Sequence, residues 1–413
     1  MRILSYLKSL NTQIALSALL GIMMGVLAQC NLLPFAPSIG YMAQVFGVLF
    51  TSLLKMVLMP LVFFTVASSL LHLRQHAQMH RVWRWTLGYF VSCTFLAAVT
   101  GLIFVNWLKP GVGVHLDWLL AANASSKTLA HSGTFTLVDF IKNALQNPIA
   151  AIVNQNVMAV VLFAILFGVG LMALGHKAAR VAALVDELAA LMLWLVHLMM
   201  RVAPLGVFGL LFHLAATQNM ALFTQLGLFI AVVFAGTLWH GFVNLPAILF
   251  VLTRRNPFRI LWDAQRPLLT AFSTSSSSAT LPVTLDTVGR KLNVDPSIGA
   301  FVTTLGSTAN MDGTVLYEAI AALFISNLMG IDLSLFQQCI VVMMASLSSI
   351  GAPGIPSAGM VTMIMVLQAV GLPAEAVVLL LPIDRLLDTV RTMVNVEGDI
   401  VGAVIVDSRV GRT

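Results

Sequence analysis

Long apolar stretches, separated by short polar ones, set the hydrophobic pattern of this chain. Residues 9–54, 202–253 and 333–374 contain no Asp, Glu, Lys or Arg. Each interval is longer than the roughly 20 apolar residues that one helical span of a bilayer needs. Ten-residue segments of alternating hydrophobicity, which are typical of barrel strands, do not occur in the sequence. The pattern predicts an all-α polytopic membrane protein, with spans at 12–30, 41–71, 85–108, 156–175, 182–216, 222–252 and 297–329, and in the last helix.

Two apolar segments in the C-terminal half are interrupted by polar residues. The first interruption, Ser273–Thr280, consists almost entirely of hydroxyl residues and lies between Pro267 and Pro282; the second, Ser348–Gly359, is rich in Gly, Pro and Ser. Non-helical backbone is tolerated at membrane depth only where it lines a cavity, so each segment predicts a re-entrant hairpin. The span between them is itself interrupted at Asn310–Thr314. Paired broken elements of this kind indicate an inverted-repeat transporter with its site near the bilayer midplane.

Composition and charge agree with a membrane location. Of the 413 residues, 59% are hydrophobic and 9% are charged, against about 25% charged in soluble domains. The formal net charge is +6, but most Lys and Arg fall in the segments that we assign to the cytoplasmic side. This bias follows the positive-inside rule, predicts two cytoplasmic termini and argues against a nucleic-acid partner. Residues 109–150 are expected to form an external excursion. The three scattered cysteines predict no disulfide.

A stripe of polar residues lies along the predicted last helix. Its members recur at helical spacing: Asp384, Asp388, Arg391, Asn395 and Asp399. Glu397 falls on the opposite face. A charge facing lipid at the bilayer centre costs roughly 2.5 to 3.5 kcal/mol, so the stripe must face protein, water or a ligand. A solvated surface helix and a buried ion-pair network are alternatives. Charges of both signs favour a zwitterion, with Asp for an amine and Arg for a carboxylate.

The remaining polar groups suggest what else could bind. Hairpin tips offer free N–H groups and helix N-termini, which favour an anion. Hard oxygen ligands suited to sodium are available from Asn310, Asp312, Asn395 and Asp399; the alternative is that hydrogen bonds alone satisfy the two carboxylates. The sequence contains no phosphate-binding loop of the Gly-x-x-x-x-Gly-Lys-Ser/Thr type. We therefore expect an ion gradient to drive the protein.

Four motifs resemble those of the dicarboxylate/amino acid:cation symporter family, which has the glutamate transporter fold. They are Ser-Ser-Ser-Ser-Ala-Thr-Leu-Pro-Val-Thr (275–284), Asn-Met-Asp-Gly-Thr (310–314), Gly-Ala-Pro-Gly-Ile-Pro (351–356) and Asp-Thr-Val-Arg-Thr-Met-Val-Asn-Val-Glu-Gly-Asp (388–399). The resemblance implies eight transmembrane helices, two re-entrant hairpins and inverted repeats. It also implies a homotrimer, in a bacterial inner membrane for prokaryotic members. Scaffold regions would be 1–72 and 110–217, and the transport unit 73–109 with 218–413.

The same resemblance implies roles for individual residues. Arg391 would hold a side-chain carboxylate, Asp388 the amine, and Asn395 with the Ser277 backbone the α-carboxylate. The remaining implied substrate residues are Ser275, Ser276, Thr314, Ile355, Gly359 and Thr392. Many prokaryotic members have an arginine just before the tip serines, where this chain has Ser275. Animal members have it in the last helix, where this chain has Thr389. Arg385, one turn before Thr389, could take the place of that arginine.

Three cation sites are implied in the same way. The first comprises Gly306, Asn310, Asn395 and Asp399; the second comprises Thr308, Ser349, Ile350 and Ala352; the third comprises Tyr89, Ser92, Cys93, Asn310 and Asp312. Cys93 replaces the usual hydroxyl of the third site, and a thiol is a poor sodium ligand.

Glu318 follows the interrupted segment by one turn in otherwise apolar sequence. An isolated carboxylate is easier to bury protonated, so Glu318 is a candidate proton carrier. Animal members of the family, which couple to protons, have Glu here. The alternative is a Glu that only hydrogen-bonds to the neighbouring hairpin.

Together these features predict a secondary active symporter, not an enzyme, that takes up glutamate or aspartate with sodium and/or protons by alternating access and needs no organic cofactor. A C4-dicarboxylate carrier would leave Asp388 without an amine, and a neutral amino acid carrier would leave Arg391 uncompensated. A channel is disfavoured because the sequence shows neither a selectivity-filter motif nor a ring of charged pore residues. An intramembrane protease would need Asp388 and Asp399 as a dyad, yet they lie about 16 Å apart along a helix.

Overall fold

A computed structural model describes residues 10–32, 36–73, 80–114, 141–142, 145–154, 156–217, 220–349, 354 and 358–410. All of the regular structure within these ranges is helical, and none of it is strand. The predicted all-α class is therefore confirmed. The tip residues Ile350, Ala352 and Ile355 of the second predicted hairpin lie outside the described ranges.

The described residues of the N-terminal half form six long helices and one short one. Their bounds are α2 (Leu10–Gln29), α3 (Ala36–Leu73), α4 (His80–Leu108), α7 (Pro148–Val153), α8 (Val157–Leu174), α9 (Ala179–Met200) and α10 (Ala203–Thr217), with a 3₁₀ turn, η2 (Gly175–Ala178), before α9. The predicted single span 182–216 is wrong: a turn at Arg201 and Val202 separates α9 from α10. Pro204 accounts for the break, because proline has no backbone N–H and so cannot continue α9 by a hydrogen bond to the Met200 carbonyl oxygen.

Most helices described in the C-terminal half are shorter, although α20 spans 30 residues. Their bounds are α11 (Met220–Trp239), the π-helical η3 (His240–Asn244), α12 (Leu245–Thr253), α13 (Pro257–Asp263), α14 (Gln265–Thr274), α15 (Ser277–Arg290), α16 (Pro296–Ala309), α17 (Asp312–Leu328), α18 (Leu335–Ser349), α19 (Ala358–Ala369), the 3₁₀ turn η4 (Ala374–Leu379) and α20 (Leu381–Val410). Helices α14 and α15 meet at Ser275 and Ser276, inside the first predicted interruption. The predicted break at 310–314 falls between α16 and α17.

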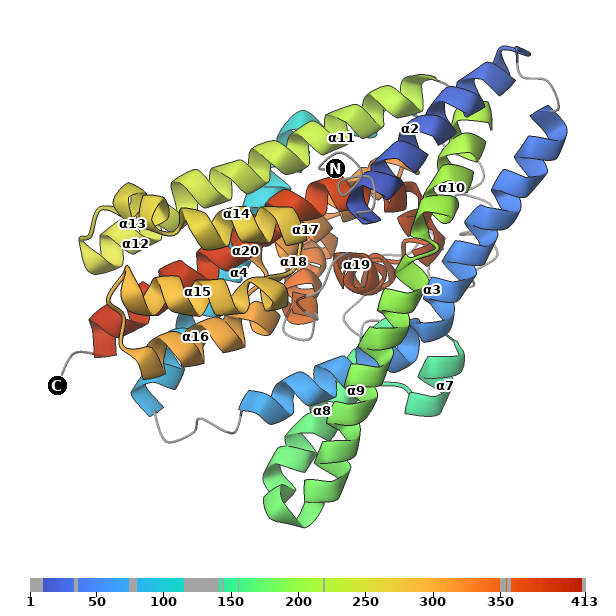
Figure 1. Ribbon diagram of the computed structural model, residues 1–413. Helices are drawn as coiled ribbons and strands as arrows, with labels where there is room; N and C mark the ends of the chain where they lie inside the picture. The colour runs from blue at the N-terminus through green and yellow to red at the C-terminus, as the bar shows by residue number, and fades with distance from the viewer. Residues whose placement is uncertain are drawn as a thin grey trace, which may run out of the picture.

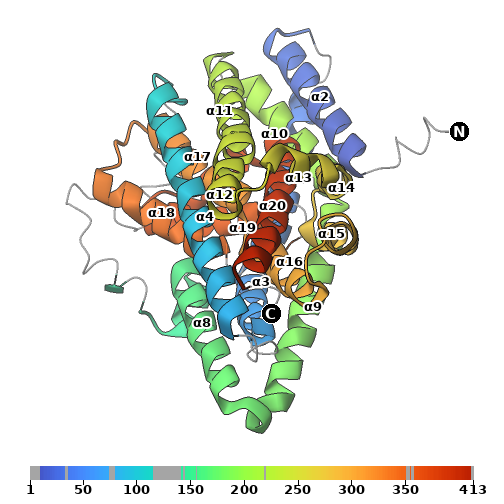
Figure 2. The same cartoon turned by 90° about the vertical axis from the view of Figure 1, so that its left-hand side faces the viewer.

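The helices form two packing groups (Figure 1). Helices α2, α3 and α10 lie side by side, and α8 and α9 pack against α3. Their close approach depends on small residues: a Cβ on Gly209 of α10 would lie 2.1 Å from the carbonyl oxygen of Ala43 in α3. The other group surrounds α20, which contacts α4, α11, α12, α14, α15, α16 and α17. The turned view in Figure 2 shows α20 among these neighbours. The division of the chain into a scaffold and a transport unit stays a prediction.

Two helices of the second group are buried along most of their length. Nearly every residue of α17 is buried, as is almost every residue of α20 from Val390 to Asp407. A largely apolar helix is expected in a core, which accounts for most of α17. Buried charged residues nevertheless occur on both helices: Asp312 and Glu318 on α17, and the polar stripe on α20. These charges must therefore meet protein groups or a ligand rather than water.

Four apolar stretches of the described chain are long enough to cross a membrane: Thr12–Gln29, Arg81–Leu108, Ala159–Met200 and Ala221–Thr253. Shorter apolar helices include Ala203–Thr217 and Leu335–Ser348. Length and composition therefore support a multi-pass membrane protein. The predicted count of eight spans and two re-entrant hairpins stays a prediction.

Candidate functional site

The polar stripe of α20 faces protein. Each of its five members exposes 5% of its surface or less: Asp384, Asp388, Arg391, Asn395 and Asp399. This burial rules out the solvated surface helix. Glu397, predicted to point away from the stripe, is also buried, and its Oε1 atom has no hydrogen-bond partner among the described residues.

The Arg391 guanidinium binds two aspartates of the stripe through one nitrogen. Nη2 donates to Asp384 Oδ1 at 2.8 Å and to Asp388 Oδ1 at 2.7 Å. Within the described chain, Nε and Nη1 have no hydrogen-bond partner. The guanidinium carbon lies 4.0 Å from the centre of the Tyr317 ring, a cation–π contact. The ion-pair network is thus present, and it leaves donors with which a planar guanidinium can bind a carboxylate.

Three helices meet around Arg391. A Cβ on Gly359 of α19 would lie 3.5 Å from Arg391 Nη1. At Gly313, near the start of α17, a Cβ would lie 2.6 Å from the Arg391 carbonyl oxygen, so only glycine fits there without a shift. Asn395 Oδ1 accepts from the Gly313 amide at 2.8 Å, and its Nδ2 donates to Thr314 Oγ1 at 3.3 Å. The structure therefore brings these predicted substrate residues together.

The serine-rich segment between α14 and α15 contacts Gly354, which lies in the second predicted interruption. Ser276 Oγ donates to the Gly354 carbonyl oxygen at 2.7 Å, and the Ser278 amide donates to the same oxygen at 3.1 Å. Ser276 also caps α15 by accepting from the Ala279 amide. Ser275 has a left-handed backbone, with φ of 50°, and its buried hydroxyl has no partner among the described residues. Ser277 is buried beside them.

Part of the first predicted cation set is also assembled. Asn310 Nδ2 donates to Asp399 Oδ1 at 3.2 Å, and a Cβ on Gly306 would lie 2.1 Å from the same oxygen. Asn310 Oδ1 is buried without a partner among the described residues. Gly306, Asn310 and Asp399 thus adjoin, and Asn395 lies one turn away on α20. Their oxygens are the kind that bind sodium.

The second predicted cation set is only partly described. Thr308 is half-buried, and its hydroxyl donates to the Leu305 carbonyl oxygen at 3.2 Å. Ser349 ends α18, but its side chain lies outside the described part, as do Ile350 and Ala352.

The structure changes the third predicted cation set. Tyr89 donates to the Gly398 carbonyl oxygen at 3.0 Å, and Asp312 is fully buried. Ser92 is exposed, on the other face of α4. Thr94 is buried instead and donates to Asp312 Oδ1 at 3.2 Å. In this structure Thr94 rather than Ser92 donates its hydroxyl to Asp312, and the cation role of Ser92 stays a prediction.

Glu318 lies at the second hairpin. It is fully buried in α17 and accepts a hydrogen bond from Ser348 of α18 at 2.8 Å and another from Thr362 of α19. A single carboxyl group therefore joins α18 and α19 to α17. These contacts match the alternative in which Glu318 only forms hydrogen bonds to the neighbouring segment.

Comparison with known proteins shows the family. A sequence model of the sodium:dicarboxylate symporter family matches residues 10–409. The chain belongs to the sodium:dicarboxylate symporter family. Excitatory amino acid transporter 3 of Mus musculus is 33% identical to it over an alignment of 411 positions, which covers 87% of this chain and 78% of that transporter. The excitatory amino acid transporter of Caenorhabditis elegans is 33% identical over 412 residues, or 87% of this chain and 80% of that protein.

A third relative is named as a transporter of neutral amino acids. Neutral amino acid transporter B(0) of Mus musculus is 32% identical over an alignment of 415 positions, which covers 89% of this chain and 74% of that transporter. Members of the sodium:dicarboxylate symporter family are transporters rather than enzymes. Family and relatives together support a cation-coupled amino acid symporter with sodium as a transported ion. The substrate of this chain is therefore inferred from the residues of the site.

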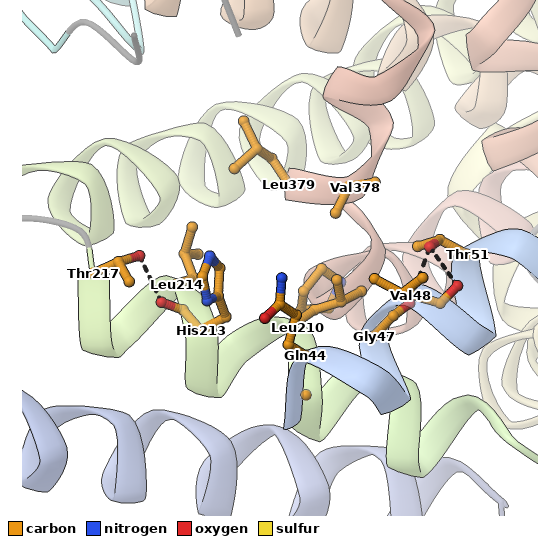
Figure 3. A pocket seen from close by; sticks show the side chains of 12 residues that line it. Gln44, Gly47, Val48, Thr51, Leu210, His213, Leu214, Thr217, Val378 and Leu379 are labelled. Carbon is orange, nitrogen blue, oxygen red and sulfur yellow. Dashed lines mark hydrogen bonds between the residues drawn. The ribbon is translucent and has the colours of Figure 1, made fainter. Parts of the chain in front are cut away.

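A separate cavity lies away from this cluster. It measures about 470 Å³ and lies between α3, α10 and the segment that leads into α20. Figure 3 shows Gln44, Gly47 and Val48 on one side, His213 and Thr217 on another, and Leu379 above. Its lining is largely apolar and includes none of the predicted substrate or cation residues.

Proposed function

We propose that this chain is a secondary active symporter that takes up glutamate or aspartate by alternating access, coupled to a sodium gradient, a proton gradient or both. Buried Arg391 carries the proposal, because Nε and Nη1 have no protein partner within the described chain. A buried cation that keeps hydrogen-bond donors unused is costly unless a ligand meets it. The carboxylate side chain of an acidic amino acid is such a ligand.

The roles of the other substrate residues follow from their places around Arg391. Asp388 holds the amine of the substrate. Asn395, Thr314 and Thr392 approach from α17 and α20, where all three are buried. The serine tip and Gly359 close the two hairpins over the substrate. The contact of the tip with Gly354 supports this, since it joins the first hairpin to the second.

A neutral amino acid symporter is the second candidate, favoured by the relative named neutral amino acid transporter B(0). Competition for uptake of labelled aspartate separates the candidates. Excess glutamate is expected to abolish the signal, whereas alanine and succinate leave most of it. Strong competition by alanine would favour the neutral carrier, and strong competition by succinate would favour a C4-dicarboxylate carrier.

The coupling ions are assigned to two places. Sodium binds the oxygens around Asn310, Asp312 and Asp399, which lie in apolar surroundings where a cation offsets their charge. Glu318 carries the proton inward with the substrate. The protein acts as a homotrimer in a bacterial inner membrane, with both termini in the cytoplasm, 1–72 and 110–217 as scaffold and the rest as the moving unit.

Replacing Glu318 with Gln tests the proton assignment. Gln mimics the protonated carboxyl group permanently, so Glu318→Gln is expected to keep substrate exchange and to lose the pH dependence of net uptake. Wild-type net uptake should rise as the external pH falls, because protonation of Glu318 then precedes inward movement. Net uptake and exchange are measured in proteoliposomes across a pH series. Exposed Glu187 of α9 provides the control variant, Glu187→Gln. A wild-type pH profile in Glu318→Gln would transfer the role to Glu397.

A further inference from the structure

A second kind of metal-binding group lies at the junction of α4, η3 and α17. Cys93 Sγ lies 3.9 Å from His240 Nε2, and His240 Nε2 lies 3.5 Å from Asp312 Oδ2. All three ligand atoms lie within 4.8 Å of one another, and all three side chains are fully buried. His240 belongs to none of the cation sets described above. A thiol, an imidazole and a carboxylate therefore face one another in the core.

The spacing fits a small divalent cation. Zinc binds Cys, His and Asp at about 2.0 to 2.3 Å, so two ligand atoms on one tetrahedral ion lie about 3.3 to 3.8 Å apart. The His240–Asp312 separation of 3.5 Å already lies in that range, and the Cys93–His240 separation of 3.9 Å lies just above it. The third separation, between Cys93 Sγ and an Asp312 carboxylate oxygen, is at most 4.8 Å, so the ion would draw these two ligands together. Thiolate and imidazole ligands select zinc-class ions, whereas sodium prefers oxygen.

The neighbouring residues orient two of the three ligands. Thr94 donates to Asp312 Oδ1, which leaves Oδ2 buried with no hydrogen-bond partner in the described chain. Asn244 lies one turn after His240. Its Nδ2 lies 3.1 Å from His240 Nδ1 and donates to Thr100 Oγ1 at 2.8 Å. Turning the Asn244 amide end for end, with the Thr100 hydroxyl turned from the Leu96 carbonyl toward the amide oxygen, presents that oxygen to Nδ1–H and leaves the Nε2 lone pair for a metal.

Charge also balances. A Cys93 thiolate and the Asp312 carboxylate together offset the two positive charges of the ion, so the occupied site is neutral in a low-dielectric core. The S–H bond of Cys93 breaks as the sulfur–metal bond forms, and its proton is released to solvent. One proton is released for each ion bound. The carboxylate of Glu397 lies close by, its Oε2 being 3.0 Å from the Cβ position of Gly241.

We propose that Cys93, His240 and Asp312 form an inhibitory binding site for a zinc-class divalent cation. Occupancy ties α4, η3 and α17 together and removes Cys93 and Asp312 from the third cation set. The bound ion therefore blocks the cation-coupled cycle. Binding itself needs no substrate, so it can be measured whether or not the proposed transport function is correct.

Cadmium alone is the probe for binding, because its bond to a thiolate absorbs in the ultraviolet. Purified full-length protein carrying Cys30→Ser and Cys339→Ser, which removes the two exposed thiols, is incubated with cadmium without substrate. One equivalent per chain is expected to produce the band, and excess zinc to abolish it. Cys93→Ser should eliminate the band, and His240→Gln should weaken binding at least about tenfold.

Asn244→Ala is the second variant in case a ligand variant fails to fold, which size-exclusion chromatography reveals. It leaves all three ligands in place and should weaken cadmium binding about 10- to 100-fold. A band that persists in Cys93→Ser, or wild-type affinity in Asn244→Ala, would overturn the site. The ratio of uptake with and without zinc then tests inhibition: it should be low in the parent and approach one in Cys93→Ser. A parent that binds one ion yet transports equally with zinc would contradict the inhibitory role alone.

Discussion

Replacing Arg391 with Ala is expected to abolish uptake of acidic amino acids. The guanidinium is fully buried and keeps Nε and Nη1 without a partner in the described chain. Loss of a desolvated charge pair costs about 2 to 5 kcal/mol, so aspartate affinity should fall at least about 30-fold. Arg391→Lys, which keeps the charge but loses the planar fork, should be intermediate. Equilibrium binding of labelled aspartate measures both.

Two controls make this result interpretable. Arg391→Ala leaves Asp384 and Asp388 without their shared cation, which can destabilise the fold; thermal unfolding reports that effect separately. Arg290→Ala removes an exposed arginine of α15 that pairs with Asp286 at the surface, and this variant should bind aspartate normally. Wild-type aspartate affinity in a folded Arg391→Ala protein would end its assignment to the substrate carboxylate.

Asp399→Asn and Asp388→Asn are expected to fail in different ways. Asp399 adjoins Gly306 and Asn310, so its neutralisation should raise the sodium concentration needed for substrate binding at least about tenfold, the size of one charged contact. Asp388 lies against Arg391 instead. Its neutralisation should weaken amino acid binding and spare the binding of an amine-free dicarboxylate.

Sodium titrations of aspartate and succinate binding measure the difference. Asp286→Asn, at an exposed aspartate of α15, controls for the loss of a carboxylate as such. Equal sodium shifts in Asp388→Asn and Asp399→Asn would remove the division between an amine-binding and a cation-binding carboxylate.

Much of this architecture could be predicted from the sequence, because bilayer physics restricts what an apolar chain can form. Charge-free intervals predict helices, and a charged stripe at helical spacing must be covered by protein, as α20 is. The break between α16 and α17 was predictable from polar residues and a glycine in an apolar span. The left-handed Ser275 and the close contact at Gly313 fall where the motifs place the site.

Other features depend on side-chain orientation and tertiary contacts. Ser92 and Thr94 are equally polar, and only the buried face of α4, formed by Tyr89, Phe90, Cys93 and Thr94, distinguishes them. The spacing of the three cysteines predicted no metal site. Cys93 meets His240 and Asp312 because α4, η3 and α17 come together in the fold. The π-helical geometry of η3 could not be predicted from its sequence.

Uptake of radiolabelled aspartate and glutamate into proteoliposomes, under separately imposed sodium and proton gradients, tests whether the protein is a cation-coupled symporter. We expect accumulation above the external concentration when an inward sodium gradient, a proton gradient or both are present. We expect no accumulation when both gradients are absent. Equilibration without accumulation under every gradient would show a passive pathway and contradict cation-coupled symport.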